Sequence, residues 1–167
     1  MAKIERKYLA HFINAALPGA EAAVYERLGK DLEEFSPSLS AQVDKKKNIM
    51  GETSINISSY EKSASVEPFY ADKDSALFAR LQGIINESLV LDDLRTDVID
   101  VKLWDEAANG AYPAVKEEAY IEVTSYGGDT TGYQIPFTVH YTGVKTRGTF
   151  DIKTRTFTPA AAEAAEE

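Results

Sequence analysis

Few side chains in this 167-residue sequence could carry out chemistry, and they are scattered along it. There is no cysteine, which excludes disulfides, thiolate metal sites and thiol catalysis. The two histidines, His11 and His140, have no partner at the spacing of metal ligands, and no GxSxG nucleophile motif is present. We therefore expect both histidines to lie at a surface or an interface, rather than to bind a metal or act as a base.

Carboxylates stand in neighbouring pairs at residues 92–93, 105–106 and 117–118. Adjacent residues of a strand point to opposite faces, so such pairs predict a solvated acidic surface better than an acid–base pair. Residues 127–132 superficially resemble a phosphate-binding loop, but they lack the GxxxxGKS/T spacing and join two expected strands. The sequence therefore predicts a protein that is not an enzyme and has no cofactor or metal; an active site built from unlinked residues is the alternative.

The charge balance argues against a nucleic-acid-binding protein. The formal net charge is -9, and the only basic run is Lys45-Lys46-Lys47. A groove that grips phosphates needs clustered lysines and arginines, and an acidic chain repels DNA. The charge remains compatible with a wall past which DNA slides. No apolar run reaches the roughly 20 residues of a membrane span, and His11 and Asn14 interrupt the apolar start, so we expect no secretory signal.

These residues must be positioned by a mainly β architecture. The strongest strand pattern is residues 133–142, where Tyr133, Ile135, Phe137, Val139 and Tyr141 share one face. Residues 119–126 precede it through a hairpin loop at 127–132, and residues 148–157 follow it after a turn at 143–147. The three strands predict an antiparallel meander.

The remaining elements are less regular. Residues 97–104 and 54–58 predict strands, and residues 23–34 predict a weaker one that Gly29 interrupts. Residues 73–86 predict one amphipathic helix, which Asp72 or Asp74 would cap. Residues 5–16 are compatible with a helix or a strand.

Two segments lack a core pattern. Residues 36–52 form a long predicted loop, and such loops in compact domains are usually functional or disordered. Residues 159–167 predict a flexible C-terminal tail. The rest of the chain, residues 1–158, is expected to be a single domain without internal repeats: a sandwich of antiparallel strands with one helix.

Particular stretches carry a more specific signal than this layout. They are residues 7–15 (KYLAHFINA), 27–37 (RLGKDLEEFSP), 48–52 (NIMGE), 58–62 (SSYEK) and 126–137 (YGGDTTGYQIPF). Together they resemble the major tail tube proteins of long-tailed phages and prophages of Gram-positive gut bacteria. The resemblance covers roughly residues 7–158, and it rests on whole segments instead of a short catalytic motif.

The resemblance implies a fold, an assembly and a location. It implies a mainly β fold of two packed antiparallel β-sheets, a β-sandwich or half-barrel, flanked by one α-helix and bearing a long stacking loop. Homohexameric rings would stack into a hollow tail tube with a negatively charged lumen, which conducts DNA into the host without binding it. Further partners would be a tape-measure protein, a distal tail protein and a tail terminator. The protein would be made in the bacterial cytoplasm and reside in the virion tail.

Within this interpretation, residues 36–52 suit the element that reaches the next ring, and a merely solvated loop is the alternative. The candidate stacking residues are Lys45, Lys46, Lys47, Asn48 and Ile49. A negative wall keeps DNA from sticking. The candidate acidic residues of the lumen are Glu117, Glu122, Asp100 and Asp129.

Two other classes remain open. The inner tube of a contractile tail or of a secretion-type injection system would share the fold and add a sheath partner. A small β-sandwich binding module would stay monomeric. A sizing column separates the monomeric module from the tubes, and a negative-stain micrograph of rings or tubes would identify the class.

Overall fold

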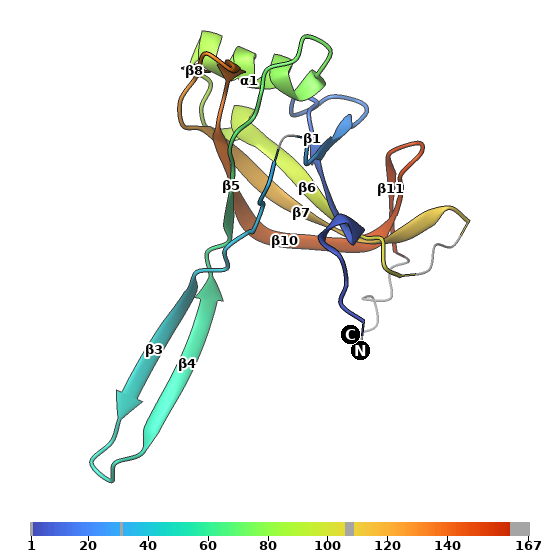
Figure 1. Ribbon diagram of the computed structural model, residues 1–167. Helices are drawn as coiled ribbons and strands as arrows, with labels where there is room; N and C mark the ends of the chain where they lie inside the picture. The colour runs from blue at the N-terminus through green and yellow to red at the C-terminus, as the bar shows by residue number, and fades with distance from the viewer. Residues whose placement is uncertain (1, 31, 106–108, 161–167) are drawn as a thin grey trace.

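The computed structural model describes residues 2–30, 32–105 and 109–160, and this part of the chain is mainly β with one α-helix (Figure 1). The helix is α1 (Ala76–Glu87), and two short 3₁₀ helices are η1 (Arg6–Tyr8) and η2 (Leu91–Leu94). The strands are β1 (Leu9–Asn14), β2 (Tyr25–Leu28), β3 (Ala41–Lys47), β4 (Thr53–Tyr60), β5 (Ser63–Val66), β6 (Arg95–Lys102), β7 (Ala111–Val123), β8 (Gly127–Asp129), β9 (Gly132–Gln134), β10 (Phe137–Asp151) and β11 (Thr156–Pro159). The predicted mainly β, antiparallel fold class with a single helix is confirmed.

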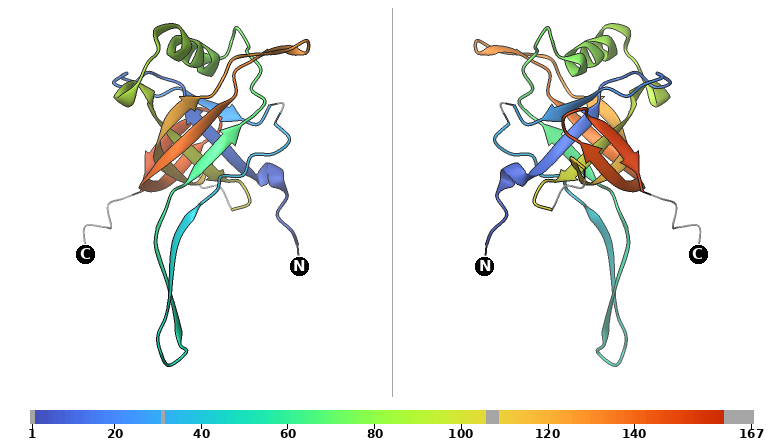
Figure 2. Two further views of the ribbon diagram at one scale, coloured as in Figure 1. Left: turned by 90° about the vertical axis from the view of Figure 1, so that its left-hand side faces the viewer. Right: turned by 90° about the vertical axis from the view of Figure 1, so that its right-hand side faces the viewer.

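One strongly curled sheet forms the body of the molecule (Figure 2). Its seven strands are antiparallel in the order β11-β10-β7-β6-β1-β2, and β5 pairs with β10 off this path. Two-stranded sheets, β3-β4 and β8-β9, extend from it. The described sheet ends at β2 on one side and at β5 and β11 on the other, so it is a half-barrel that does not close on itself.

Strand β10 produces much of this curvature, and here the sequence-based prediction was wrong. Residues 143–147 do not form a turn: they belong to the 15-residue strand β10. The register with β7 shifts between Tyr141 and Lys145, because Gly143 adopts a φ of 94° in a bulge opposite Glu118. A bulge bends and twists its strand. The reversal falls later, between Asp151 and Thr156, where β11 returns antiparallel to β10.

Two hydrophobic cores lie on opposite faces of the curled sheet. Helix α1 covers the first, in which Leu77 and Leu81 pack on buried residues of β6, β7 and β10. The second is centred on Phe12 and Phe150, whose ring centroids are 4.5 Å apart. Successive residues of a strand alternate between faces. Strand β1 therefore contributes Phe12 to one core and Ile13 to the other, which makes it almost continuously apolar.

Helix α1 begins later than its acidic flank suggested. Ser75 is the N-cap, and its hydroxyl accepts a hydrogen bond from the Phe78 amide. Asp72 instead accepts from the Asp74 amide in the preceding turn. The helix is tied to the sheet by Arg80, whose buried guanidinium donates to the carbonyls of Asn14, Ala16, Asp93 and Arg95.

The predicted loop at residues 36–52 is also corrected. From Ala41 onward the chain forms β3, which pairs along its length with β4 and builds a hairpin that projects away from the body (Figures 1 and 2). We call residues 41–60 the arm. Strand β3 has Val43 as its one large apolar residue and buries no side chain, so its segment lacked a strand pattern and was predicted to be a loop. The predicted strand at residues 54–58 lies within β4, which is also exposed along its whole length. The predicted start of the flexible C-terminal tail at residue 159 was wrong, because Pro159 is the last residue of β11. Residues 161–167 of the predicted tail lie outside the described residues.

Candidate functional site

The arm is the most conspicuous candidate for a functional element. Every residue of β3 and β4 is exposed, although both strands contain apolar side chains. In the register of the hairpin, Val43 lies opposite Ile57, and Lys45 lies opposite Ile55. Residues that lie opposite each other share a face. One face of the arm therefore carries Val43, Ile55 and Ile57 together with Lys45 and Lys47.

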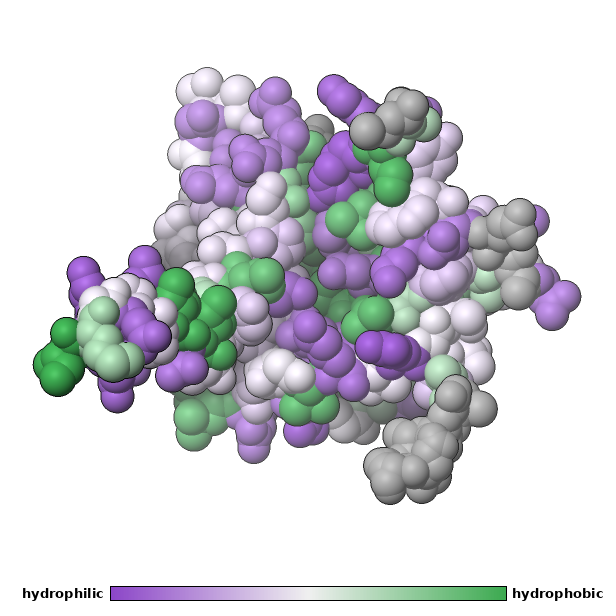
Figure 3. Space-filling view, turned by 90° about the horizontal axis from the view of Figure 1, so that it is seen from below, coloured by the Kyte–Doolittle hydropathy of each residue, from purple (hydrophilic) through white to green (hydrophobic). Residues whose placement is uncertain are grey.

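The other face of the arm is polar. It carries Asp44 opposite Asn56 and Lys46 opposite Ser54. Viewed from below, hydrophobic and hydrophilic residues lie side by side on the arm (Figure 3). The three candidate lysines thus divide between the faces: Lys45 and Lys47 flank the apolar residues, and Lys46 points the other way.

The tip of the arm is an ordered turn. The side-chain oxygen of Asn48 accepts from the amides of Met50 and Glu52, and its amide donates to the Glu52 carboxylate. This arrangement leaves Ile49 and Met50 as the most exposed large apolar residues of the arm. Asn48 shapes the turn, and Ile49 lies fully exposed at its end.

The candidate acid Asp100 is already engaged. It lies 2.7 Å from Nδ1 of His11, which is buried within the subunit, whereas a surface or interface position was expected. The other ring nitrogen of His11 lies 2.9 Å from the Arg6 guanidinium, which also donates to the carbonyls of Leu9 and Phe35. Because both ring nitrogens have partners, His11 ties the N-terminal segment and residue 35 to the sheet instead of presenting a free base.

Glu117 is buried and paired, so it is not an exposed acid of a channel wall. Its carboxylate lies 2.9 Å from Lys62 Nζ, and the Lys62 ammonium sits 4.4 Å from the centre of the Tyr141 ring. Burial, with the nearby charges of Asp100 and Glu117, raises the pKa of Tyr141. Lys62 follows the arm by two residues, so this pair anchors the base of the arm.

The other two candidate acids lie elsewhere. Glu122 is exposed and lies 2.6 Å from His140, which is exposed as predicted. Asp129 is exposed at the β8–β9 turn, where hydrogen bonds from Thr131 lower its pKa. Glu117 and Glu122 are five residues apart on one strand and so face opposite sides of the sheet. The four predicted acids therefore do not line one wall.

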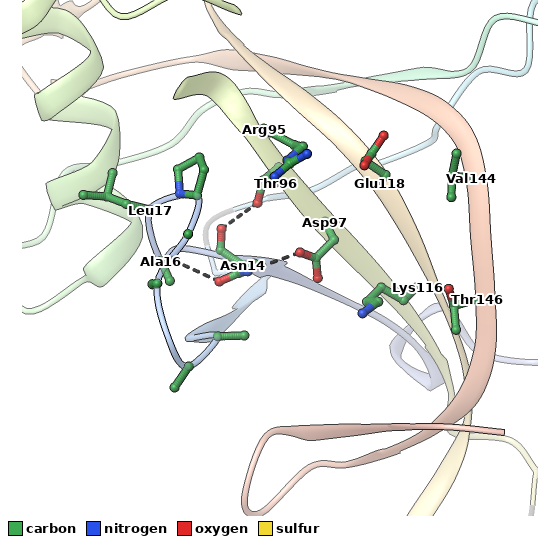
Figure 4. Close-up of a pocket in the computed structure, with 15 residues that line it drawn as sticks. Asn14, Ala16, Leu17, Arg95, Thr96, Asp97, Lys116, Glu118, Val144 and Thr146 are labelled. Carbon is green, nitrogen blue, oxygen red and sulfur yellow. Dashed lines mark hydrogen bonds between the residues drawn. The ribbon is translucent and has the colours of Figure 1, made fainter. Parts of the chain in front are cut away.

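A polar groove of about 300 Å³ opens on the face of the sheet that carries Glu118 (Figure 4). Asn14 accepts from the Ala16 and Val24 amides and donates to Asp97, and Tyr25 donates to the same carboxylate across 2.6 Å. Burial and the hydrogen bond to Asp97 raise the pKa of Tyr25 above its ordinary range. These groups satisfy one another, so they hold the 15–24 loop on the sheet; Glu118 and Lys116 line the groove beside them.

No group of three or more potential metal ligands occurs among residues 2–30, 32–105 and 109–160. The same part of the chain contains no helix long and apolar enough to cross a membrane. Neither a known protein-family model nor a curated protein matches this sequence. The arm, the open edges of the sheet and its polar face are thus the features on which a function must be argued.

Proposed function

We propose that this chain is a structural subunit of a phage tail tube, in which hexameric rings stack around a channel that conducts DNA into the host. The observation that carries the proposal is the arm. It is a fully exposed two-stranded hairpin, and it bears six exposed large hydrophobic residues: Val43, Ile49, Met50, Ile55, Ile57 and, at its base, Tyr60.

An isolated two-stranded hairpin is at best marginally stable in water, and contiguous exposed apolar surface marks an interaction site. Val43, Ile55 and Ile57 are each about half exposed. A neighbouring subunit that covered them would remove this surface from water and add to the stability of the arm. The arm points away from the body, so its partner must lie beyond the end of the subunit, as in a stack of rings (Figure 1).

The open half-barrel supports the formation of rings. Strand β2 at one end of the sheet and β11 at the other offer backbone groups to a further strand, and so does β5 beyond the bridge that pairs its Ser63 with Ser38. A heterologous contact that joins one end to the opposite end of the next copy closes a ring when the rotation permits. Such closure removes exposed edges from every subunit at once.

The polar face of the sheet suits the inner wall of the channel. Glu118 and Glu122 lie on this face of β7, with Thr138 and His140 of β10 beside them. Asp100 and Glu117 lie on the other side of the sheet, where they are paired with His11 and Lys62. They are therefore not among the acids that we propose for the channel wall. Repulsion by a net negative wall keeps DNA from adhering during transit.

In this role the chain carries out no reaction and binds no cofactor. Its main partner is itself, and a tape-measure protein, a distal tail protein and a terminator would meet the tube at its lumen and ends. Its place is the virion tail, after synthesis in the bacterial cytoplasm. A monomeric binding module remains the second candidate only if the arm has no partner in solution.

Truncation of the arm tests the proposal. The register pairs Lys45 with Ile55, so replacing residues 45–55 by Asn-Gly shortens the arm without changing the pairing below it. We expect the wild-type chain to form rings or tubes in negative-stain micrographs at high concentration. The shortened chain should have the same melting temperature as the wild type. In sedimentation it should show no species larger than a single ring, because its rings cannot stack into tubes. A wild-type chain that remains monomeric at millimolar concentration, or a shortened chain that still grows tubes, overturns the proposal.

A further inference from the structure

The end of the molecule opposite the arm carries a second unpartnered apolar surface. A groove of about 450 Å³ runs beside α1, and its lining includes Leu17, Pro18, Ala79, Gly83, Glu87 and Asp93. Ala76, Ala79 and Gly83 form the outward stripe of α1, and Leu17 beside them is 60% exposed. Figures 1 and 2 place α1 at one end of the body and the arm at the other.

We propose that the apolar face of the arm docks in this α1 groove of a second copy, head to tail. The inference rests on the proposed function, because it names the receptor surface for the stacking arm. Small side chains on the outward stripe allow a strand to approach the helix closely, and Leu17 and Pro18 provide an apolar wall. Val43, Ile55 and Ile57 are the side chains that would enter.

Charge matches across the two surfaces. Lys45 and Lys47 flank the apolar residues of the arm, and the exposed carboxylates of Glu87 and Asp93 border the groove. The arm has three lysines against Asp44 and Glu52, so it is slightly positive, whereas the whole chain has a net charge of -9. Opposite charges on the rim of an interface fix its register and speed association.

The dimensions also match. The arm face from Val43 to Lys47 extends about 13 Å at the rise of a β-strand, and α1 extends about 16 Å from Ala76 to Glu87.

Because the chain has no cysteine, introduced cysteines report contacts selectively. Ile57→Cys in an untagged chain and Ala79→Cys in a tagged chain are mixed and oxidised, and the mixed disulfide is followed on a gel. We expect it to form at least tenfold faster than the disulfide between Asn56→Cys, on the polar face of the arm, and the same Ala79→Cys chain. Equal rates for the two pairs overturn the docking model.

A steric block provides a second readout. No atom lies within 4 Å of a Cβ added at Gly83, so Gly83→Leu in the tagged chain should fold as well as the parent. Gly83→Leu should abolish the fast disulfide formation between Ile57→Cys and Ala79→Cys. If the rate of this cross-link is unchanged by Gly83→Leu, the arm does not dock in the groove. If wild-type rings and tubes form while the Ile57–Ala79 cross-link is absent, the groove is wrong and the tube proposal stands. If neither assembly nor any fast cross-link is found, both fail.

Discussion

Replacing Lys62 by methionine tests whether Glu117 is a structural anchor or a channel acid. Lys62 Nζ lies 2.9 Å from Glu117 Oε1, and the two side chains are 16% and 6% exposed. Methionine keeps the apolar stem but removes the ammonium, which leaves a carboxylate buried without its partner. Breaking a buried pair in this way costs about 3–5 kcal/mol, and the partial access of solvent to Lys62 favours the lower end.

For a domain of this size, about 1 kcal/mol shifts the melting temperature by about 2–4 °C, so Lys62→Met should lower it by about 6–12 °C. Thermal unfolding followed by circular dichroism measures the shift. Lys30→Met is the matched control, because Lys30 and Asp72 form an exposed pair at 3.8 Å that contributes about 0–1 kcal/mol.

The double variant Lys62→Met/Glu117→Gln separates the charge from the packing. It removes the unpaired carboxylate, so most of the lost stability should return. If Lys62→Met melts within the range of Lys30→Met, or if the second substitution restores nothing, the anchoring role of the pair is refuted.

Three further outcomes are expected. Arg80→Met leaves four carbonyls without their donor and should lower the free energy of unfolding by at least about 3 kcal/mol in urea, whereas Arg155→Met, which loses one hydrogen bond to Tyr25, should lower it far less. The pKa values of Tyr25 and Tyr141 are raised above the ordinary 10.0, so the folded state holds these protons more tightly than the unfolded state. The contribution of these two groups to stability is therefore fully present below about pH 10, and the free energy of unfolding should fall as the pH rises above it. An ultraviolet titration should accordingly show two of the nine tyrosines ionising only on unfolding, and one in Tyr25→Phe. Glu122→Lys should leave assembly intact but make tubes co-sediment with double-stranded DNA at low salt, and a variant that binds no more DNA than wild type would remove Glu122 from the wall.

Regular alternation made the central strands predictable. Ile135, Phe137 and Val139 are buried as their period-two spacing indicated, and Leu77, Leu81 and Ile84 form the buried stripe of the predicted helix. The predicted strand at residues 133–142 is nevertheless divided: β9 ends at Gln134, β10 begins at Phe137, and Tyr133 is exposed. Local geometry was harder to predict. The pair of acids before α1 resembled a cap, but the hydroxyl of Ser75 reaches the Phe78 amide, and a cap depends on that backbone geometry.

The bulge in β10 shows why the turn was misplaced. Gly143 followed by Lys145 and Arg147 has the composition of a turn, and a glycine with positive φ serves a turn or a bulge equally well. Pairing with β7 on both sides of Gly143 selects the bulge, and this pairing involves residues more than twenty positions away in the chain. The pattern of neighbouring residues in the sequence therefore does not reveal this strand pairing.

For the candidate acids, too, the sequence reveals one property and the tertiary structure decides another. Sequence parity alone separates Glu117 from Glu122, since an odd spacing on one strand means opposite faces. The burial of Glu117, however, depends on Lys62 in the connection between β4 and β5, and the engagement of Asp100 depends on His11 from β1.

The sequence by itself determined the class of the fold, the position of the helix and the acidic character of the surface, because each follows from periodicity or composition within one segment. Only the tertiary structure decided that residues 41–60 form a projecting arm, that a bulge curls the sheet, and that its edges remain open in the described chain. These features arise from strand pairing and from the absence of burial. An amphipathic strand that will pack on another molecule has the same alternation as one that packs on its own core, so only the three-dimensional arrangement tells them apart.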